Sequence, residues 1–425
     1  MSMTNSVRNP HRDVIVCGAG PVGLAAALAL ADTGAAVAIC GELPEDAPAN
    51  PDLRTAALFA PQIEILAGLG IWPGLEASCA PMRGIRLVDD MGHVLRAPET
   101  LFMARDADLP ELGHNCPNPA LVGALAGALR DRPEIDCRFG ARVISVEHDP
   151  DHEAATPVVR FTVPGRAKVE ELRAPLIVAA DGRNSLARTA AGIGTRTWDT
   201  RQSALTAHIH HSEPHHGIST EFHRPGGPVT VVPMPGDRSA LIWVDRPGAI
   251  RQLVAQESAR AIHLVADELH GLLGEIREIS PLRSFPLTGR VARRLAGRRT
   301  AVIGEAAHVF PPIGAQGLNL SLRDVATLAE TVGEARSGGE DIGSDAVLEA
   351  YARRRLVDTH LRAHGVDLLG ATLTSAWPAP ALVRGATLHA VNASPALKRA
   401  MILQALGPRL QAPRAGLTQP HTSLQ

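Results

Sequence analysis

Residues 13–40 most constrain the fold of this 425-residue chain. Residues 13–17 (DVIVC) form a short apolar run, typical of a buried parallel strand, and lead directly into Gly18-Ala-Gly20-Pro-Val-Gly23. A segment with helical spacing and a second apolar run follow. This order of strand, glycine turn, helix and strand is that of a dinucleotide-binding βαβ unit. We therefore predict an α/β, Rossmann-like domain in which Gly18 makes the turn, Gly20 admits the pyrophosphate and Gly23 lets the helix pack on the strand.

The acid that usually binds the adenosine ribose is expected at the end of the second strand, about 20 residues beyond the glycines. Gly41 occupies the aligned place, and Glu42 follows it. We expect Glu42 to bind the ribose after a shift of one residue. The alternative is a solvated loop acid.

A second glycine-containing turn lies late in the chain, where residues 300–303 predict a short buried strand and a helix begins near Gly314. Gly314 and Gly317 let backbone amides approach a ligand, and the amides at a helix start favour an anionic group. Glu305, at the end of the strand, could accept hydrogen bonds from sugar hydroxyls. The alternative is a strand-to-helix turn without a ligand.

Three other positions between these turns are candidates for binding. Arg54 is expected at the head of an apolar helix, where it could reach a phosphate or remain in water. Asn118 is a predicted N-cap of the helix over residues 118–129. Asp181 and Gly182 follow the predicted buried strand 176–180. An acid and a glycine at the end of such a strand indicate another edge at which a ligand could bind.

Residues 202–244 alternate with a period of two, which predicts an antiparallel sheet as the floor of a substrate site. On this sheet we expect His208 and His210 to share one face with Ala204 and Thr206. The histidine cluster in residues 208–216 has no cysteine or carboxylate at ligand spacing. We therefore interpret it as edge-strand and loop histidines and predict no metal site.

The separated motifs predict a nucleotide domain built from three parts of the chain, with substrate strands inserted between them. A C-terminal helical region follows, and its helix 395–406 either covers a core or contacts a partner or a bilayer surface. The predicted boundaries are 1–78, 111–192 and 289–340 for the cofactor domain, 79–110 and 193–288 for the substrate domain, and 341–425 for the helical region.

Composition excludes several classes of protein. Hydrophobic residues at 45% and charged residues at 20% are typical of a globular enzyme. A net charge of −2 lacks the excess of positive charge that is typical of nucleic-acid-binding proteins. The sequence contains no apolar run of about 18–20 residues and no signal-peptide core, so we expect a cytoplasmic protein. We interpret the five cysteines as buried thiols of a reducing compartment rather than disulfides.

Three motifs together resemble the flavin-dependent aromatic hydroxylases of the p-hydroxybenzoate hydroxylase fold: GAGPVG at 18–23, DGRNS at 181–185 and GEAAHVFPPIGAQGLNLSLRD at 304–324. The surrounding sequence (DLRTAAL, ELGHNCPNPAL, AGIGTRTWDTRQSAL) is more similar to the branch that hydroxylates the ring of ubiquinone precursors. The resemblance covers most of the chain, including the C-terminal helices, and the late motif is the most specific.

The resemblance implies an FAD cofactor whose binding residues come from several turns. Where the family usually has Asp on the ribityl chain, this sequence has Glu305. The assignments are Gly18, Gly20 and Gly23 for the pyrophosphate, Glu42 for the adenosine ribose, Arg54 and Asn118 for the flavin side, Asp181 and Gly182 for the pyrophosphate and pyridine-nucleotide path, Glu305 for the ribityl chain, Pro312 for a carbonyl facing flavin and substrate, and Gly314, Gly317, Leu318 and Asn319 for amides at the isoalloxazine.

The implied activity is hydroxylation of a polyprenylated phenol in ubiquinone biosynthesis, with NAD(P)H and O2, through a flavin hydroperoxide. His208 or His210 is the candidate base for the phenol proton, and His308 is expected to be structural. A prenyl tail would bring the C-terminal helices to the inner face of the membrane or to a quinone-synthesis complex. The alternatives are a hydroxylase of a soluble aromatic compound and a non-catalytic scaffold. The ring position, the choice between NADH and NADPH and the oligomeric state stay open.

Overall fold

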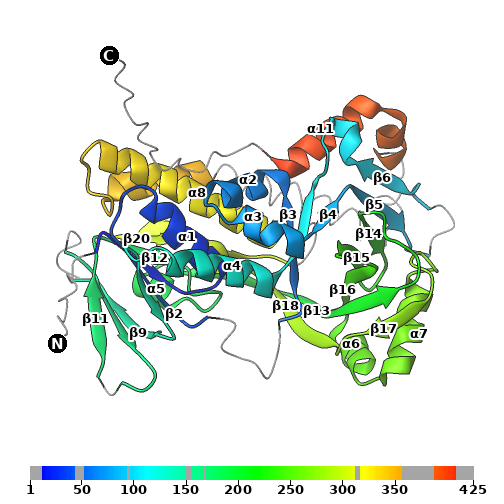
Figure 1. The fold of residues 1–425 in the computed structure, drawn as a ribbon, viewed down its shortest axis with the longest axis horizontal. Helices are drawn as coiled ribbons and strands as arrows, with labels where there is room; N and C mark the ends of the chain where they lie inside the picture. Colours follow the sequence, from blue (N-terminus) through cyan, green and yellow to red (C-terminus); the bar gives the residue numbers. More distant parts are fainter. Residues whose placement is uncertain are drawn as a thin grey trace, which may run out of the picture.

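The computed structural model describes residues 12–43, 52–92, 96–149, 155–166, 168–311, 316–356 and 387–407. A body built on a six-stranded sheet lies beside a body built on a nine-stranded sheet (Figure 1). Pro312 and Gly314 lie outside the described residues, as do residues 357–386, where helices are predicted.

The six-stranded sheet carries the N-terminal βαβ unit. All its neighbouring strands pair in parallel except β19, and β1 and β12 are buried along their whole length, as expected for strands covered on both faces. Helices α8, α1 and α4 lie side by side against it (Figure 1). The order is β19 (Ala296–Gly297), β20 (Thr300–Val302), β12 (Leu176–Ala179), β1 (Val14–Cys17), β2 (Val37–Gly41) and β8 (Asp136–Phe139), with helices α1 (Pro21–Ala31), α4 (Asn118–Arg130) and α8 (Gln316–Ser337).

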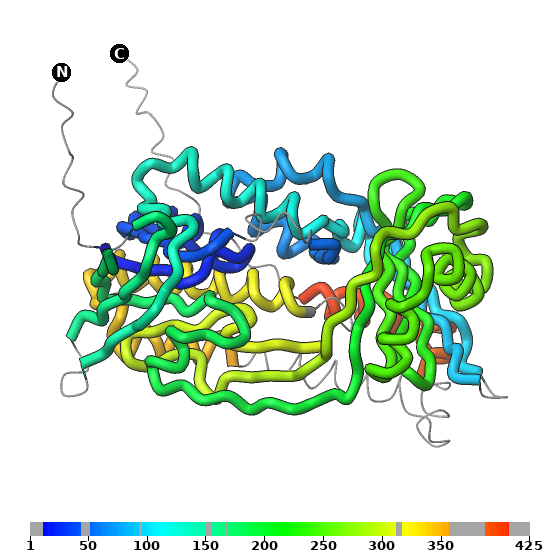
Figure 2. The backbone as a smooth tube through the Cα atoms, turned by 90° about the horizontal axis from the view of Figure 1, so that it is seen from below, coloured from blue at the N-terminus to red at the C-terminus, as the bar shows by residue number. Residues whose placement is uncertain are grey.

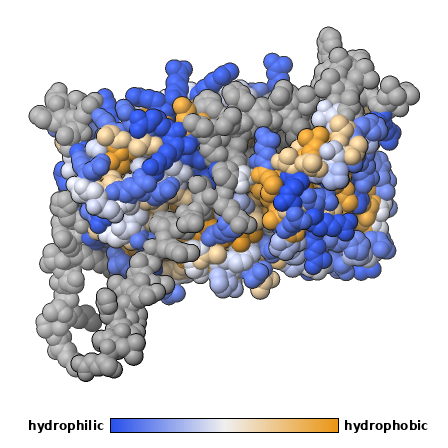
Figure 3. Space-filling model, turned by 90° about the horizontal axis from the view of Figure 1, so that it is seen from above, coloured by the Kyte–Doolittle hydropathy of each residue, from blue (hydrophilic) through white to orange (hydrophobic). Residues whose placement is uncertain are grey.

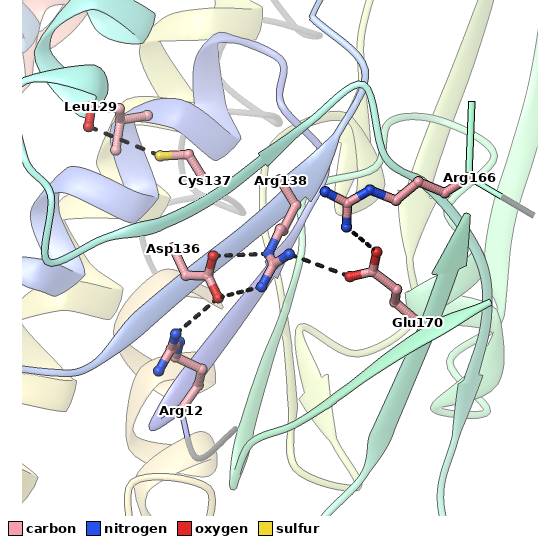
Figure 4. A network of polar contacts seen from close by, with 7 residues as sticks. All are labelled: Arg12, Leu129, Asp136, Cys137, Arg138, Arg166 and Glu170. Atoms are coloured by element: carbon pink, nitrogen blue, oxygen red, sulfur yellow. Dashed lines mark hydrogen bonds and ion pairs between the residues drawn. The ribbon is translucent and has the colours of Figure 1, made fainter. Parts of the chain in front are cut away.

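A small antiparallel sheet extends this body, as the sequence predicted. Its strands are β9 (Arg142–Glu147), β10 (Val158–Thr162) and β11 (Glu170–Arg173), and α5 (Leu186–Ala190) packs against β9 and β12. A chain of alternating charges joins it to the edge strand β8 (Figure 4). Arg12 donates to Asp136 (2.9 Å), Arg138 donates to both Asp136 (3.2 Å) and Glu170 (3.3 Å), and Arg166 also pairs with Glu170.

The nine-stranded sheet is antiparallel except where β14 pairs with β5. Its long strands β13 and β18 run from one body into the other, as the extended green and yellow-green segments of Figure 2 show. The order is β21 (His308–Val309), β18 (Arg283–Ala292), β13 (Thr195–His211), β16 (Arg238–Asp245), β15 (Val229–Met234), β14 (Ile218–His223), β5 (Gly84–Asp89) and β6 (Thr100–Met103), with β17 (Ile276–Ile279) paired to β13.

The two faces of this sheet have different partners. Helices α6 (Pro247–Val254) and α7 (Ser258–Glu268) cover the face that carries Leu205, Ala207 and Ile209 of β13. On the opposite face, side chains of β15 and β16 pack with the 3-10 turn η3 (Ala104–Ala107) and with α11 (Pro395–Leu406). The predicted C-terminal helix therefore covers a core on this side.

A fourth sheet corrects one expectation. Arg54 does not head a helix, because residues Thr55–Phe59 form strand β3, and the helix α2 begins only at Ala60. Pairing with β7 decides the local structure over the helix preference of the two alanines in this strand. The sheet has the order β3, β7 (Gly113–Pro117) and β4 (Ala80–Met82), and α2 (Ala60–Gly68), α3 (Trp72–Leu75) and η2 (Glu76–Ser78) connect β3 to β4.

The same sheet corrects the cysteine interpretation. Cys79 and Cys116 form a disulfide, with Cα atoms 4.4 Å apart, because Ala80 pairs with Asn115 and the preceding and following residues therefore face each other. Strand register, which spacing in the sequence does not reveal, brings them together. Cys17 and Cys40 are buried thiols as predicted, and burial raises the pKa of Cys40 to about 12.

A buried ion-pair network joins the late motif to the C-terminal helix over residues 345–356. Asp324 of α8 accepts hydrogen bonds from the Gly304 backbone (3.0 Å), His308 (2.8 Å) and Arg355 (2.7 Å), and Tyr351 donates to the Val302 carbonyl (3.0 Å). His308 is thus structural, as expected. Burial acts to raise the pKa of Asp324, but the charges of Arg355 and His308 hold it below its usual value.

We expect Asp324→Asn to lower the free energy of unfolding by about 3–5 kcal/mol, because the charge of Arg355 would stay buried without its counter-ion. Since the pKa of Asp324 is lowered in the folded state, its stabilisation is present above the unfolded pKa of about 4 and is lost as pH falls through the lowered value. Urea unfolding at several pH values measures both effects.

The control is Glu334→Gln, which removes an exposed ion pair with Arg354 (2.7 Å) between the same two helices and should cost less than about 1 kcal/mol. An Asp324→Asn variant as stable as this control would contradict the assigned role.

Candidate functional site

Four turns meet at the carboxyl edge of the parallel strands, the edge at which open α/β sheets bind ligands. Backbone hydrogen bonds join neighbouring turns directly: Gly18 N to Cys40 O (2.7 Å), Ala180 N to Cys17 O (2.9 Å) and Ile303 N to Ala179 O (3.1 Å). Turns from sequence positions near 18, 41, 181 and 304 thus form one continuous edge.

Three glycines of this edge are required by packing. A Cβ on Gly18 would lie 2.3 Å from the Ala180 carbonyl oxygen, and Gly18 also has a left-handed φ of +111°. A Cβ on Gly23 would lie 2.0 Å from the Gly18 oxygen, and one on Gly41 would lie 2.3 Å from the Ala19 nitrogen. Gly41 therefore stands where an acid is usual because the end of β2 packs directly on the first glycine turn.

Other glycines of the edge face open space. A Cβ on Gly20, Gly182 or Gly317 would meet no described atom within 4 Å. The N-cap of α1 is Gly20, which has no side chain to accept a hydrogen bond. The first amides of this helix therefore have no side-chain acceptor from the N-cap residue. Unfilled glycine positions beside free amides are what a diphosphate group requires. This edge therefore fits the cofactor that the motifs predict.

The acids of the edge differ in their surroundings. Glu42 directly follows β2 and is exposed. The carboxylate of Asp181 instead accepts hydrogen bonds from the Ser185 hydroxyl and from the backbone amides of Leu186 (2.7 Å) and Ala187 (3.1 Å). The Asp181 side chain thus binds the first two amides of α5, next to the N-cap Ser185, and the Gly182 carbonyl accepts from the Ser185 amide (3.0 Å).

Glu305 lies in the 3-10 turn η4 (Gly304–Ala306) and pairs with Arg183 of the neighbouring turn at 3.6 Å. Both side chains are about half exposed, at 50% and 43%. Hydrogen bonds with Asp52 raise the pKa of Arg54, and the charge of Glu305 adds to this effect. Glu305 and Arg54 therefore lie in the same region of the site.

Asn118 and Arg54, both predicted on the flavin side, contact the same acid. The Asp52 carboxylate accepts two hydrogen bonds of 2.8 Å from the Arg54 guanidinium and one of 3.2 Å from the Asn118 amide. Helix α4 starts at Asn118 with Pro117 as its N-cap, so the capping role expected for the Asn118 side chain is wrong. Asp52 was not among the predicted site residues; its signal in the sequence is the DLR spacing, which places an acid two residues before Arg54.

The start of α8 is tied to β3. Asn319 donates to the Ala57 carbonyl (2.7 Å) and accepts from the Phe59 amide (3.0 Å), so its side chain substitutes for a strand partner. Leu318 packs half-buried against the core of the six-stranded body. Any contact of these two residues with a cofactor would therefore come from their backbone.

His208 and His210 lie on the face of β13 opposite the α6 and α7 side. The Nε2 of His208 donates to the Leu53 carbonyl oxygen at 2.8 Å, so the neutral ring carries its free lone pair on Nδ1. Burial lowers the pKa of His208 below the usual 6.5, which keeps the ring neutral near pH 7. Only His208 of the two contacts the loop that carries Arg54.

Two further histidines of the cluster have structural contacts. His211 contacts the Glu213 carbonyl (2.8 Å) and Ser239 (3.0 Å), and His215 contacts the Met234 carbonyl (2.9 Å). Within the part of the chain that the structure describes, no three His, Cys, Asp or Glu side chains gather as a metal site.

A pocket of about 390 Å³ lies outside this arrangement, beside the charge network of Figure 4. It is lined by Cys137, Arg138, Phe139, Val163 and Arg166, none of which the sequence analysis selected.

Known proteins resemble the chain over most of its length. The model of the FAD binding domain family matches residues 11–360. The chain is 32% identical to the 3-demethoxyubiquinol 3-hydroxylase of Escherichia coli (strain K12), with 88% of this chain and 93% of that protein covered. It is 33% identical to the ubiquinone hydroxylase UbiL of Rhodospirillum rubrum, over 88% of this chain and 84% of that protein.

A solved structure has the same fold. The p-nitrophenol 4-monooxygenase PnpA of Pseudomonas putida DLL-E4 superposes with a TM-score of 0.75 at 19% identity, over 94% of this chain and 99% of that one. At this identity the likeness concerns the fold alone.

We expect Gly41→Ala to destabilise the protein by about 1–3 kcal/mol, because the added methyl group overlaps the Ala19 backbone. The displaced turn should also weaken FAD binding. The matched control is Gly127→Ala in α4, where a Cβ meets nothing within 4 Å and helix preference should stabilise by about 0.5–1 kcal/mol. Urea unfolding and FAD titration of both variants test the packing, and equal behaviour of the two would contradict it.

Proposed function

The chain belongs to the FAD binding domain family, and from this premise we propose that it is an FAD-dependent monooxygenase that hydroxylates the aromatic ring of a polyprenylated phenol in ubiquinone biosynthesis. NAD(P)H and O2 are its co-substrates. The observation that carries this proposal is the meeting of four turns from distant parts of the chain at one sheet edge. The names of the two ubiquinone hydroxylases support the substrate class.

Different residues of the edge bind different parts of FAD. Gly20 and the first amides of α1 bind the diphosphate, Glu42 binds the adenosine ribose, and Glu305 binds the ribityl chain. Arg54, Asn118 and the backbone at Gly317, Leu318 and Asn319 face the flavin ring, and we assign the same side to Pro312 and Gly314. When bound, FAD supplies the redox chemistry that activates O2 with electrons from NAD(P)H.

We assign the protein's part in proton transfer to His208. Its neutral ring presents the Nδ1 lone pair, which can accept the proton of a phenol and so make the ring more nucleophilic. His210 lies two residues further along the same strand face, but among the described residues its side chain makes no hydrogen bond to the 52–54 loop. His208 is therefore the stronger of the two candidates.

The C-terminal helix α11 supplies a surface for a prenylated substrate. Its Ile402 and Leu406 are buried against the substrate body, whereas Leu397 and Leu403 are 41% and 45% exposed. Lys398 pairs with Asp106 at 3.9 Å. The face of the molecule that carries α8 and α11 shows apolar patches within a largely polar surface (Figure 3). We place this face at the inner surface of the membrane.

Among the described residues, no helix combines the length and the apolar character that crossing a bilayer requires.

The substrate class is tested with purified protein, FAD, NADPH and lipid extracts. We expect prenylated phenols to gain one oxygen atom, detected by mass spectrometry, while short-chain phenols react at least about tenfold more slowly, because the tail contributes apolar binding energy of about 0.8 kcal/mol per buried CH₂. The reverse preference would assign the protein to soluble aromatic substrates, and absence of any hydroxylation with bound FAD would favour a scaffold.

A further inference from the structure

Residues 52–54 include Arg54 and contact two further residues that the proposed function uses. The Asp52 carboxylate holds the Arg54 guanidinium through two hydrogen bonds of 2.8 Å and the Asn118 amide through one of 3.2 Å. The carbonyl of Leu53, between them, accepts the Nε2 hydrogen of His208 at 2.8 Å. One short segment therefore reaches the cofactor body, through Asn118 of α4, and the substrate sheet, through His208 of β13.

The direction of the Leu53 carbonyl depends on Asp52. The Asp52 carboxylate also accepts a hydrogen bond from the Arg54 backbone amide (3.0 Å), which closes a turn over Leu53 and fixes the two peptide planes beside it. A carbonyl fixed in this way selects the His208 tautomer with the hydrogen on Nε2 and the lone pair on Nδ1. Asp52 thus acts on the imidazole without touching it.

The burial of Asp52 also supports a structural role for this acid. The Asp52 side chain is 24% exposed, while that of its partner Arg54 is 53% exposed. Burial acts to raise the pKa of Asp52, but the hydrogen bonds from Arg54 and Asn118 hold it below the usual value. Asp52 is therefore charged at neutral pH and keeps the half-exposed guanidinium in one orientation at the edge of the site.

We propose that Asp52 is a positioning residue that couples the substrate sheet to the flavin side of the cofactor site, by orienting Arg54, Asn118 and, through the Leu53 carbonyl, His208. This inference rests on the proposed function for the roles of those three residues. It assigns Asp52 itself no contact with substrate or flavin.

The test compares two variants of Asp52 with the wild-type protein. In Asp52→Asn, removing the charge and one acceptor should weaken FAD binding about tenfold, measured by titration of the apoprotein with FAD. Asp52→Ala also removes the acceptor that closes the turn over Leu53. In its apoprotein, labelled with ¹⁵N-histidine, the His208 ring signals, assigned with His208→Gln, should change from one tautomer to a mixture. This second readout does not depend on FAD.

The matched control is Asp341→Asn. Asp341 makes the same two-pronged pair with Arg299 (3.0 and 2.6 Å), at the amino end of β20 and therefore opposite the sheet edge where the four turns meet. This control should leave FAD affinity within about twofold and the His208 signals unchanged. Arg54→Lys tests the orienting role separately, since it keeps the charge but loses the two-pronged geometry, and it should weaken FAD binding while leaving the His208 tautomer unaltered.

Wild-type or tighter FAD binding by Asp52→Asn, or an unaltered His208 tautomer in Asp52→Ala, would overturn the proposal. Failure of the proposed function gives a different result. The wild-type protein would then bind no FAD, while the His208 signals would still respond to Asp52→Ala.

Discussion

Close packing of glycine backbones at one sheet edge is the constraint on which the site depends. Gly18 lies between the Ala180 carbonyl and the Ala19–Gly41 contact, and Gly23 packs on Gly18 itself, so any Cβ there would overlap backbone atoms. Backbone atoms cannot move aside as side chains do, so the packing of Gly18, Gly23 and Gly41 fixes the turns after β1, β2 and β12 relative to one another. Within the described part of the chain, no atom lies beside the Cβ positions of Gly20, Gly182 and Gly317, which leaves room for an extended dinucleotide to lie against amides.

The rest of the molecule holds this edge in place and connects it to the substrate sheet. Asp324 joins the fourth turn to α8 and to the helix over residues 345–356, and Asn319 joins the start of α8 to β3. The long strands β13 and β18 span both bodies (Figure 2). Because β3 follows the 52–54 loop directly, the residues expected to face a flavin and the histidine expected to face a phenol are held by adjacent backbone.

The sequence predicted those parts of the fold that depend on local patterns. Buried parallel strands, the first glycine turn, the β9–β11 meander and the antiparallel sheet all have characteristic periods or turn residues, and the structure confirms them. The errors occur where distant pairing decides the outcome: Thr55–Phe59 is a strand because of β7, Cys79 and Cys116 meet through strand register, and Asn118 turns to Asp52 rather than to its own helix. Asp52 was missed for the same reason, since its partner Asn118 lies 66 residues away.

The central claim is that the edge formed by these turns binds one FAD. The most direct measurement is the absorption spectrum of the purified protein, followed by release of the bound flavin and its identification by mass. The account predicts a flavin spectrum, release of intact FAD and about one FAD per chain after reconstitution. A colourless protein that takes up no FAD when folded, or one that releases a different cofactor, would contradict the account.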